Sequence, residues 1–226
     1  MDLCQLSVRL KILIPILIIL FPVVFWLVLT TGKNAFRTLP VFGPIHVGEK
    51  GDTLFHEVKD FTFINQKGDS IRYSDLDGKI VVAGFFSIQC ADSCIKLMEE
   101  MRRLQFLFED DSLVRFLSFS LDPDRDSIPA LDAYATSLKA NADRWWLIYG
   151  NRDSILNLCR ESFLIHPEIN DDIENLQAPD QLILIDSKRR IRGYYDGMEK
   201  ADVDTLRDEI KILLFEKRRL GQQQVS

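Results

Sequence analysis

The sequence predicts an α/β fold with a central mixed sheet between helices, preceded by a single transmembrane helix. Short apolar runs alternate with segments of helical period along most of the 226 residues, and this alternation is typical of helices packed on a sheet. The chain then closes with a predicted hairpin and a helix, which favours a mixed sheet. An uncharged stretch near the N-terminus predicts the membrane segment.

That stretch is residues 12–32, which hold 21 uncharged and mostly aliphatic or aromatic side chains. As a helix they would extend about 31 Å, close to the thickness of a hydrocarbon core of about 30 Å. A cleaved signal peptide is the main alternative, but no small-x-small cleavage site follows. We therefore expect a cytoplasmic segment at 1–11, a single-pass anchor in the cell membrane at 12–32 and a domain outside the cytoplasm, on the periplasmic side.

The remainder divides into a linker at 33–57, a domain at 58–220 and a tail at 221–226. The linker is expected because residues 33–57 are rich in proline and glycine and have little periodicity. The chain has a formal net charge of −6, and the part after Arg37 contains 24 basic and 33 acidic residues. Because binding to phosphates requires a basic surface, we expect no nucleic-acid partner.

Within the domain, periodicity separates the predicted strands from the predicted helices. The strand-like runs are residues 58–64, 80–86, 113–121, 145–149, 181–186 and 191–195. The helical stretches are residues 94–108, 127–139 (capped by Asp126 or Ser127), 154–165 and 203–214. Residues 166–180 are polar and acidic without a period, which indicates a long loop.

Cys90 and Cys94 follow the apolar run at 80–86 and stand at the predicted start of a helix. Their spacing of four places both thiols on one side of its first turn, where unpaired amides and the helix dipole favour thiolates. The pair could form a reversible disulfide, hold a soft metal such as Cu(I), or simply pack as two small apolar side chains. Cys159 differs, because it belongs to an apolar helical stripe and is expected in the core.

Two segments around these cysteines, GFFSIQCADSC at 84–94 and SFSLDPDRD at 118–126, resemble the Sco/SenC family of membrane-anchored thioredoxin-like proteins. The resemblance covers about residues 45–215 and extends to the N-terminal anchor. It implies a thioredoxin-like fold and a role at the copper sites of cytochrome c oxidase, through copper handling, thiol–disulfide exchange or both. The implied partner is the copper-site subunit of the oxidase or another thiol protein.

The sequence departs from that family at the expected copper-binding histidine. Family members carry it eight residues before the aspartate that ends the next strand, and if that aspartate is Asp186, the position is Ala178. Two thiolates alone could still bind Cu(I), so copper stays open as a cofactor. His166 is the nearest substitute but is expected to be solvated, while His46 and His56 are expected at the surface. Met98 and Met101 fit the core better than a metal site.

Ala178 and Pro179 immediately precede a strand expected beside the cysteine helix, so they are candidate substrate-binding residues. A cis-proline there would offer backbone groups to a substrate strand, whereas a trans proline would only break the loop. In the segment at 122–126, the proline turns the chain and the acids are expected to cap the next helix. The alternative interpretation is that residues 122–126 form a docking surface.

The leading hypothesis is thiol–disulfide exchange through Cys90 and Cys94, with Cys90 as attacking thiolate and Cys94 as resolving thiol. The second is a Cu(I) chaperone that uses the same two cysteines without a standard third ligand. The third is a docking module without chemistry, so the sequence leaves open whether the protein is an enzyme.

Overall fold

The computed structural model describes Ile18 and residues 20–25, 38–48, 52–89, 92–166 and 178–223. The chain consists of two compact units, Met1–Arg37 and Thr38–Ser226. The described residues of the first unit are helical, and no described helix of the chain has the length and apolar character that a membrane span needs. The segment at 1–11 and most of the anchor expected at 12–32 lie outside the described residues.

The second unit contains a mixed sheet of seven strands in the order β4-β3-β7-β6-β5-β8-β9. Its strands are β3 (Thr62–Asn65), β4 (Ser70–Arg72), β5 (Ile80–Phe86), β6 (Val114–Ser120), β7 (Trp145–Tyr149), β8 (Gln181–Ile185) and β9 (Ile191–Asp196). Neighbours β5, β6 and β7 are parallel, and every other pair in the sheet is antiparallel. The mixed sheet and its closing hairpin, β8–β9, are confirmed.

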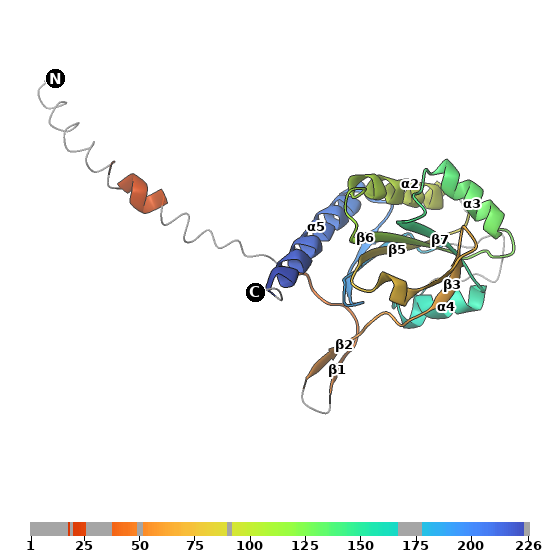
Figure 1. Cartoon of the computed structure of the whole chain (residues 1–226), viewed down its shortest axis with the longest axis horizontal. Helices are drawn as coiled ribbons and strands as arrows, with labels where there is room; N and C mark the ends of the chain where they lie inside the picture. The colour runs from red at the N-terminus through yellow and green to blue at the C-terminus, as the bar shows by residue number, and fades with distance from the viewer. Residues whose placement is uncertain are drawn as a thin grey trace, which may run out of the picture. The chain divides into compact units, whose positions relative to one another are not determined.

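Four helices pack on this sheet: α2 (Asp92–Leu107), α3 (Ile128–Ser137), α4 (Arg152–Glu161) and α5 (Lys200–Gln223). Figure 1 shows α2, α3 and α5 on one side of the sheet and α4 on the other. An ion pair of 2.9 Å between Arg103 on α2 and Asp204 on α5 joins two of these helices. The right-handed crossovers β5–α2–β6 and β6–α3–β7 require α2 and α3 to lie on the same side.

The core is built from the predicted apolar positions. Met98 and Met101 on α2 and Cys159 on α4 are fully buried, which confirms them as core residues. Phe85 and Phe119 stack between neighbouring central strands with their ring centroids 5.5 Å apart. Burial raises the pKa of the free Cys159 thiol to about 12, so this cysteine is an inert core residue rather than a nucleophile.

The segment expected as a linker at 33–57 is partly folded against the domain. Leu39 is buried, the Phe42 amide donates to the Ile191 carbonyl, and the Arg192 guanidinium donates to the carbonyls of Leu39 and Pro40. Two strands that periodicity could not reveal, β1 (Ile45–Val47) and β2 (Thr53–Phe55), form a hairpin that projects from the sheet (Figure 1). Three residues are too few to show a period of two.

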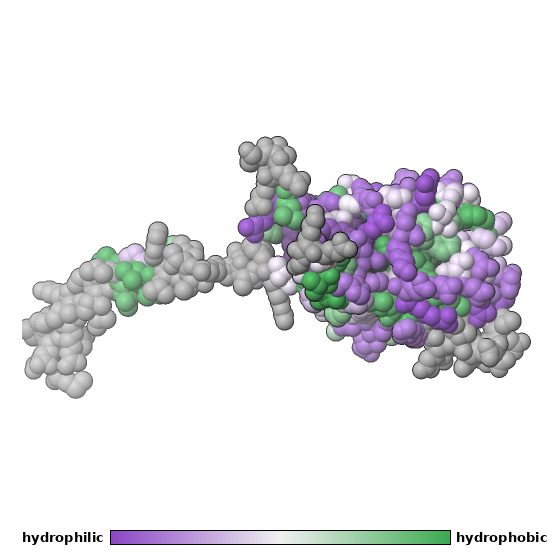
Figure 2. Space-filling model, turned by 90° about the horizontal axis from the view of Figure 1, so that it is seen from below, coloured by the Kyte–Doolittle hydropathy of each residue, from purple (hydrophilic) through white to green (hydrophobic). Residues whose placement is uncertain are grey.

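The first core strand is also shorter than predicted, because β3 begins at Thr62 instead of Val58. Seen from below, the surface of the domain is mainly hydrophilic with apolar patches between polar side chains (Figure 2). The largest exposed apolar side chains of the domain lie in three places: the hairpin and the segment before it (Phe42, Ile45, Val47, Leu54), α2 (Ile95, Phe106, Leu107) and α5 (Phe215, Leu220).

Candidate functional site

The site lies where β5 passes into α2. β5 is buried along its whole length and ends at Phe86, residues 87–89 lead away from it, and α2 begins at Asp92. Cys94 is therefore in the first turn of the helix, as predicted, and only 3% of it is exposed. Cys94 is disulfide-bonded, whereas Cys159 is a free thiol. Cys90 lies outside the described residues.

A buried carboxylate holds the segment that leads to the cysteines. Asp126 follows β6, and its two oxygens accept hydrogen bonds from the Ile88 amide at 3.3 and 3.2 Å. The Ser120 hydroxyl donates to the same carboxylate at 2.6 Å. Burial raises the pKa of Asp126, although the hydrogen bonds from Ser120 and Ile88 oppose this shift.

A second tie joins the same two segments through Arg125. Its guanidinium donates to the Asp122 carboxylate and, at 3.3 Å, to the side-chain oxygen of Gln89. Asp122 is buried, so its carboxylate fixes the position of the Arg125 guanidinium. The segment at 122–126, expected to cap a helix, thus binds the cysteine segment instead, and Ser127 takes the N-cap position of α3 without a side-chain capping bond.

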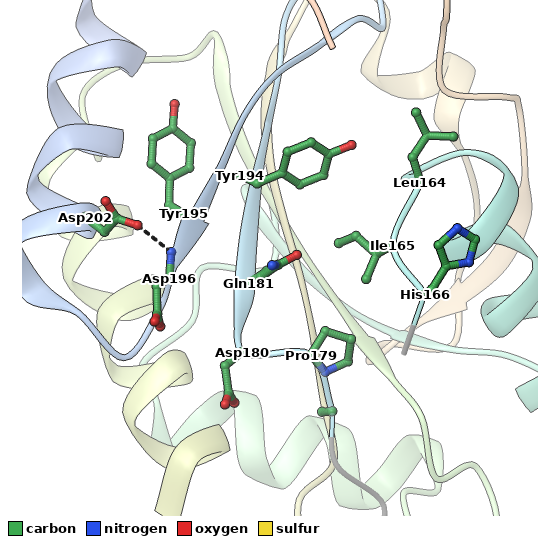
Figure 3. A pocket seen from close by; sticks show the side chains of 11 residues that line it. Leu164, Ile165, His166, Pro179, Asp180, Gln181, Tyr194, Tyr195, Asp196 and Asp202 are labelled. Atoms are coloured by element: carbon green, nitrogen blue, oxygen red, sulfur yellow. Dashed lines mark hydrogen bonds between the residues drawn. The ribbon is translucent and has the colours of Figure 1, made fainter. Parts of the chain in front are cut away.

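A cavity of about 770 Å³ opens near the start of β8 and the end of β9 (Figure 3). Its lining includes Ala178 and Pro179, the candidate substrate-binding residues, together with His166. No peptide bond among the described residues is cis, so the Ala178–Pro179 bond is trans and the cis-proline hypothesis is wrong. Figure 3 shows Pro179 and His166 on separate segments that flank the cavity.

The cavity and the cysteine helix are joined by a close contact at Gly197. The Gly197 amide donates to the Asp180 carbonyl at 2.7 Å, which closes the end of the β8–β9 hairpin. A Cβ atom on Gly197 would lie 2.8 Å from Leu97 Cδ1, and Leu97 stands three residues after Cys94 on α2. The hairpin therefore packs directly on the helix that carries Cys94, and a side chain larger than glycine would crowd Leu97 and the Asp180 carbonyl oxygen.

The described residues do not assemble a three-ligand metal site. No group of three His, Cys, Asp or Glu side chains among them could hold a metal ion. Ala178 is buried and offers no donor, and His166 is exposed. His46 is exposed as expected, but His56 is half-buried and its Nε2 lies 2.8 Å from the Ser162 carbonyl oxygen. The donors among the described residues therefore do not fit a copper site with a histidine ligand.

Sequence reasoning missed Ser120 and Asp126 as parts of the site. A capping pattern predicts which residues stand at a helix start, but not the direction in which a carboxylate turns. One signal was available, since Ser118 and Ser120 interrupt an otherwise apolar strand. Both are fully buried, and a buried hydroxyl requires a partner. Ser118 accepts from the Trp145 indole and Ser120 binds Asp126.

Comparison with known proteins identifies the family. The family model described as SCO1/SenC matches residues 50–214. The chain belongs to the SCO1/SenC family. The SCO1 protein homolog of Bacillus subtilis (strain 168) is 28% identical over 170 residues, which cover 71% of this chain and 84% of that protein. The resemblance to Sco/SenC proteins read from the two cysteine-region motifs is thereby confirmed.

Solved Sco structures share the fold. A SCO1/SenC family lipoprotein from Bacillus anthracis str. Ames superimposes with a TM-score of 0.64 at 25% identity, over 70% of this chain and 95% of that one. BsSco, described as a member of the Sco family of cytochrome c oxidase assembly proteins with a disulfide switch, gives a TM-score of 0.61 at 25% identity, over 70% and 93% of the two chains. The mixed sheet and its helices thus match the thioredoxin-like architecture of Sco proteins.

Proposed function

We propose that this SCO1/SenC protein performs thiol–disulfide exchange through Cys90 and Cys94 during maturation of the copper site of cytochrome c oxidase. The observation that carries the proposal is the position of Cys94, disulfide-bonded in the first turn of α2. We take Cys90 as its partner, because it is the nearest cysteine in the sequence, four residues earlier, and the described Cys159 is a free buried thiol. The description of BsSco as a disulfide switch in an oxidase assembly family supports the same reading.

The exchange proceeds in two balanced steps. The Cys90 thiolate attacks one sulfur of a client disulfide, a mixed disulfide forms, and the first client thiolate leaves. The Cys94 thiol then loses its proton and attacks the Cys90 sulfur, which releases the second client thiolate. The client gains two electrons, its two thiolates take up the proton lost by Cys94 and one from the solvent, and the protein is left with the Cys90–Cys94 disulfide. An extracytoplasmic dithiol donor then reduces that disulfide and returns the protein to its active form.

The architecture supports these roles. The N-terminal end of α2 presents unpaired amides and the positive end of the helix dipole, which favour a thiolate. Cys94 is buried, which suits the resolving step, and we therefore assign the attack on the client disulfide to Cys90. We also propose that the cavity beside Ala178 and Pro179 receives the client segment, because the hairpin that borders it packs on α2 through Gly197 and Leu97.

We further propose that residues 12–32 anchor the protein in a cell membrane and that the domain from residue 58 to about 220 functions outside the cytoplasm. The uncharged composition of residues 12–32 supports this arrangement. An oxidising compartment is also where a cycling disulfide can persist.

The decisive experiment uses the full chain in detergent micelles. We expect a reversible two-electron couple in glutathione buffers that disappears in Cys90→Ser and Cys94→Ser, and reduction of a disulfide in the oxidase copper-site domain by the reduced protein. Cys159→Ala is the matched control and should leave both readouts unchanged. A dithiol that shows no reversible couple would contradict the proposal.

The same preparation tests the Cu(I) chaperone, the second candidate, which two cysteines four residues apart in the sequence favour. Cu(I) is titrated against a competing chelator. If the parent protein binds Cu(I) tightly and stoichiometrically, loses this binding in Cys90→Ser and does not reduce the client disulfide, copper delivery replaces exchange as the function. The absence of both copper binding and exchange would leave a docking module.

A further inference from the structure

Asp126 is a buried carboxylate whose described partners do not include a cation. None of it is exposed, and no lysine or arginine among the described residues forms an ion pair with it. Its described hydrogen-bond partners are the Ile88 amide and the side chains of Ser120 and Ser87. Burying an acid without a counter-charge is costly. An ion pair therefore does not explain why Asp126 is buried at this position.

Helix capping does not supply that explanation. The N-cap of α3 is Ser127, and the Asp126 carboxylate accepts from the amide of Ile88 instead of from amides of α3. Ile88 belongs to the segment after β5 and stands 38 residues earlier in the chain. Asp126 therefore serves the cysteine segment rather than its own helix.

The contact between Asp126 and Ile88 lies close to Cys90 in the sequence. Ile88 lies two residues before Cys90, and its amide is the last backbone donor before that cysteine with a described long-range partner. Two residues earlier, the Phe86 carbonyl accepts from the Leu121 amide at 2.9 Å. Together the two contacts fix the direction in which the chain leaves the sheet toward the cysteine pair.

We propose that Asp126 is a positioning residue for the dithiol: by holding the Ile88 amide with support from Ser120, it keeps Cys90 where it closes the disulfide with Cys94. The proposal rests on the proposed exchange function and deepens it. Asp126 acts through the backbone and takes no part in bond making or breaking.

The proposal predicts the direction of a change in redox equilibrium. In Asp126→Asn the side chain keeps its size but loses its charge and one of the two oxygens that accept from Ile88. A loosened segment makes ring closure less favourable, and loss of a nearby negative charge favours the thiolates of the reduced form. Both effects destabilise the disulfide. We expect the equilibrium constant for oxidation by glutathione to fall at least tenfold, which is about 30 mV for a two-electron couple.

Two further variants separate positioning from general stability. Asp186→Asn alters another buried, hydrogen-bonded carboxylate, located at the far end of β8 from the cavity, and should lower stability without moving the redox equilibrium. Ser120→Ala removes one partner of Asp126 and should move the equilibrium in the same direction as Asp126→Asn by about threefold. Ser120→Ala decides the matter if Asp126→Asn does not fold.

The experiment is a glutathione titration of the full chain in detergent micelles, with the thermal midpoint of each variant measured in parallel. A redox equilibrium in Asp126→Asn within twofold of the parent, or an equal shift in Asp186→Asn, would overturn the proposal. Failure of the proposed function is a different result, because then the parent protein itself shows no reversible couple.

Discussion

At the scale of single residues, the structure separates buried polar groups that hold the fold from those that hold the site. Asp186 is the clearest example of the first kind. It is 4% exposed and accepts from the guanidinium groups of Arg190 at 2.7 Å and Arg192 at 2.9 Å. Through Arg192 this cluster also reaches Leu39, so one carboxylate joins the β8–β9 turn to the N-terminal segment of the domain.

We expect Asp186→Asn to destabilise the domain by about 3 kcal/mol at pH 7, because it leaves the buried Arg192 with only the more distant Glu216 carboxylate, at 3.7 Å, as a charge partner. Burial alone would raise the pKa of Asp186, but hydrogen bonds from Arg190, Lys188 and Arg192 outweigh it and lower the pKa. A lowered folded pKa contributes stability above the unfolded value of about 3.9, and this stability is lost as the pH falls through the folded pKa. The difference between parent and variant should therefore shrink below about pH 4.

Urea unfolding of both proteins between pH 3 and pH 7 measures this difference. Asp208→Asn is the control, because Asp208 also has a lowered pKa but sits in an exposed cluster with Arg207 and Lys211. Exposed ion pairs contribute little to stability, so this variant should stay close to the parent at pH 7. A deficit in Asp186→Asn that is constant across the pH range would contradict the linkage.

At the scale of elements, the sequence predicts long periodic segments well and short or local ones poorly. The buried run at 80–86 and the strand at 145–149 match β5 and β7 residue for residue. The β1–β2 hairpin was missed because three exposed residues per strand carry no hydrophobic pattern. The site follows the same rule: periodicity places Cys94 at the start of α2, but the contact of Asp126 with Ile88 joins segments that no local pattern connects.

The packing of the β8–β9 hairpin on α2 can be tested at Gly197. A methyl group there would lie 2.8 Å from Leu97 Cδ1 and 3.0 Å from the Asp180 carbonyl oxygen. We expect Gly197→Ala to destabilise the domain by about 2 kcal/mol, because the core must shift to admit the methyl group. The displaced helix turn should also change the rate at which reduced Cys94 is alkylated. Urea unfolding and mass spectrometry of the alkylated protein measure the two effects.

Gly68→Ala provides the matched control for this prediction. Gly68 has a φ of +85°, and its added methyl group would meet no atom within 4 Å. This variant should lose about 1 kcal/mol from backbone strain alone and should leave the alkylation of Cys94 unchanged. Equal alkylation rates in both glycine variants would show that the hairpin does not position the cysteine helix.

At the scale of the whole molecule, the family fold is present while the position expected for its histidine ligand carries Ala178. That residue lines the cavity beside Pro179, is 8% exposed and offers no donor atom. Such an arrangement favours exchange by two sulfurs over retention of Cu(II), which is stabilised by nitrogen ligands. The protein thus keeps the fold of its relatives, and we expect Ala178, which offers no donor atom, to disfavour a copper site with an imidazole ligand.

Restoring the imidazole should reverse this preference. We expect reduced Ala178→His to bind Cu(II) at least tenfold more tightly than the parent, with a thiolate-to-copper charge-transfer band, because imidazole and thiolate donors together suit copper. Ala178→Leu is the control, since it fills the same place without a donor. If the two variants bind Cu(II) equally, Ala178 does not face the dithiol, and the cavity beside it is not part of the same site. Tighter Cu(II) binding in Ala178→His alone would mean that residue 178 and the cysteines lie around one metal position. It would also show that a single substitution converts an exchange site into a metal-binding site.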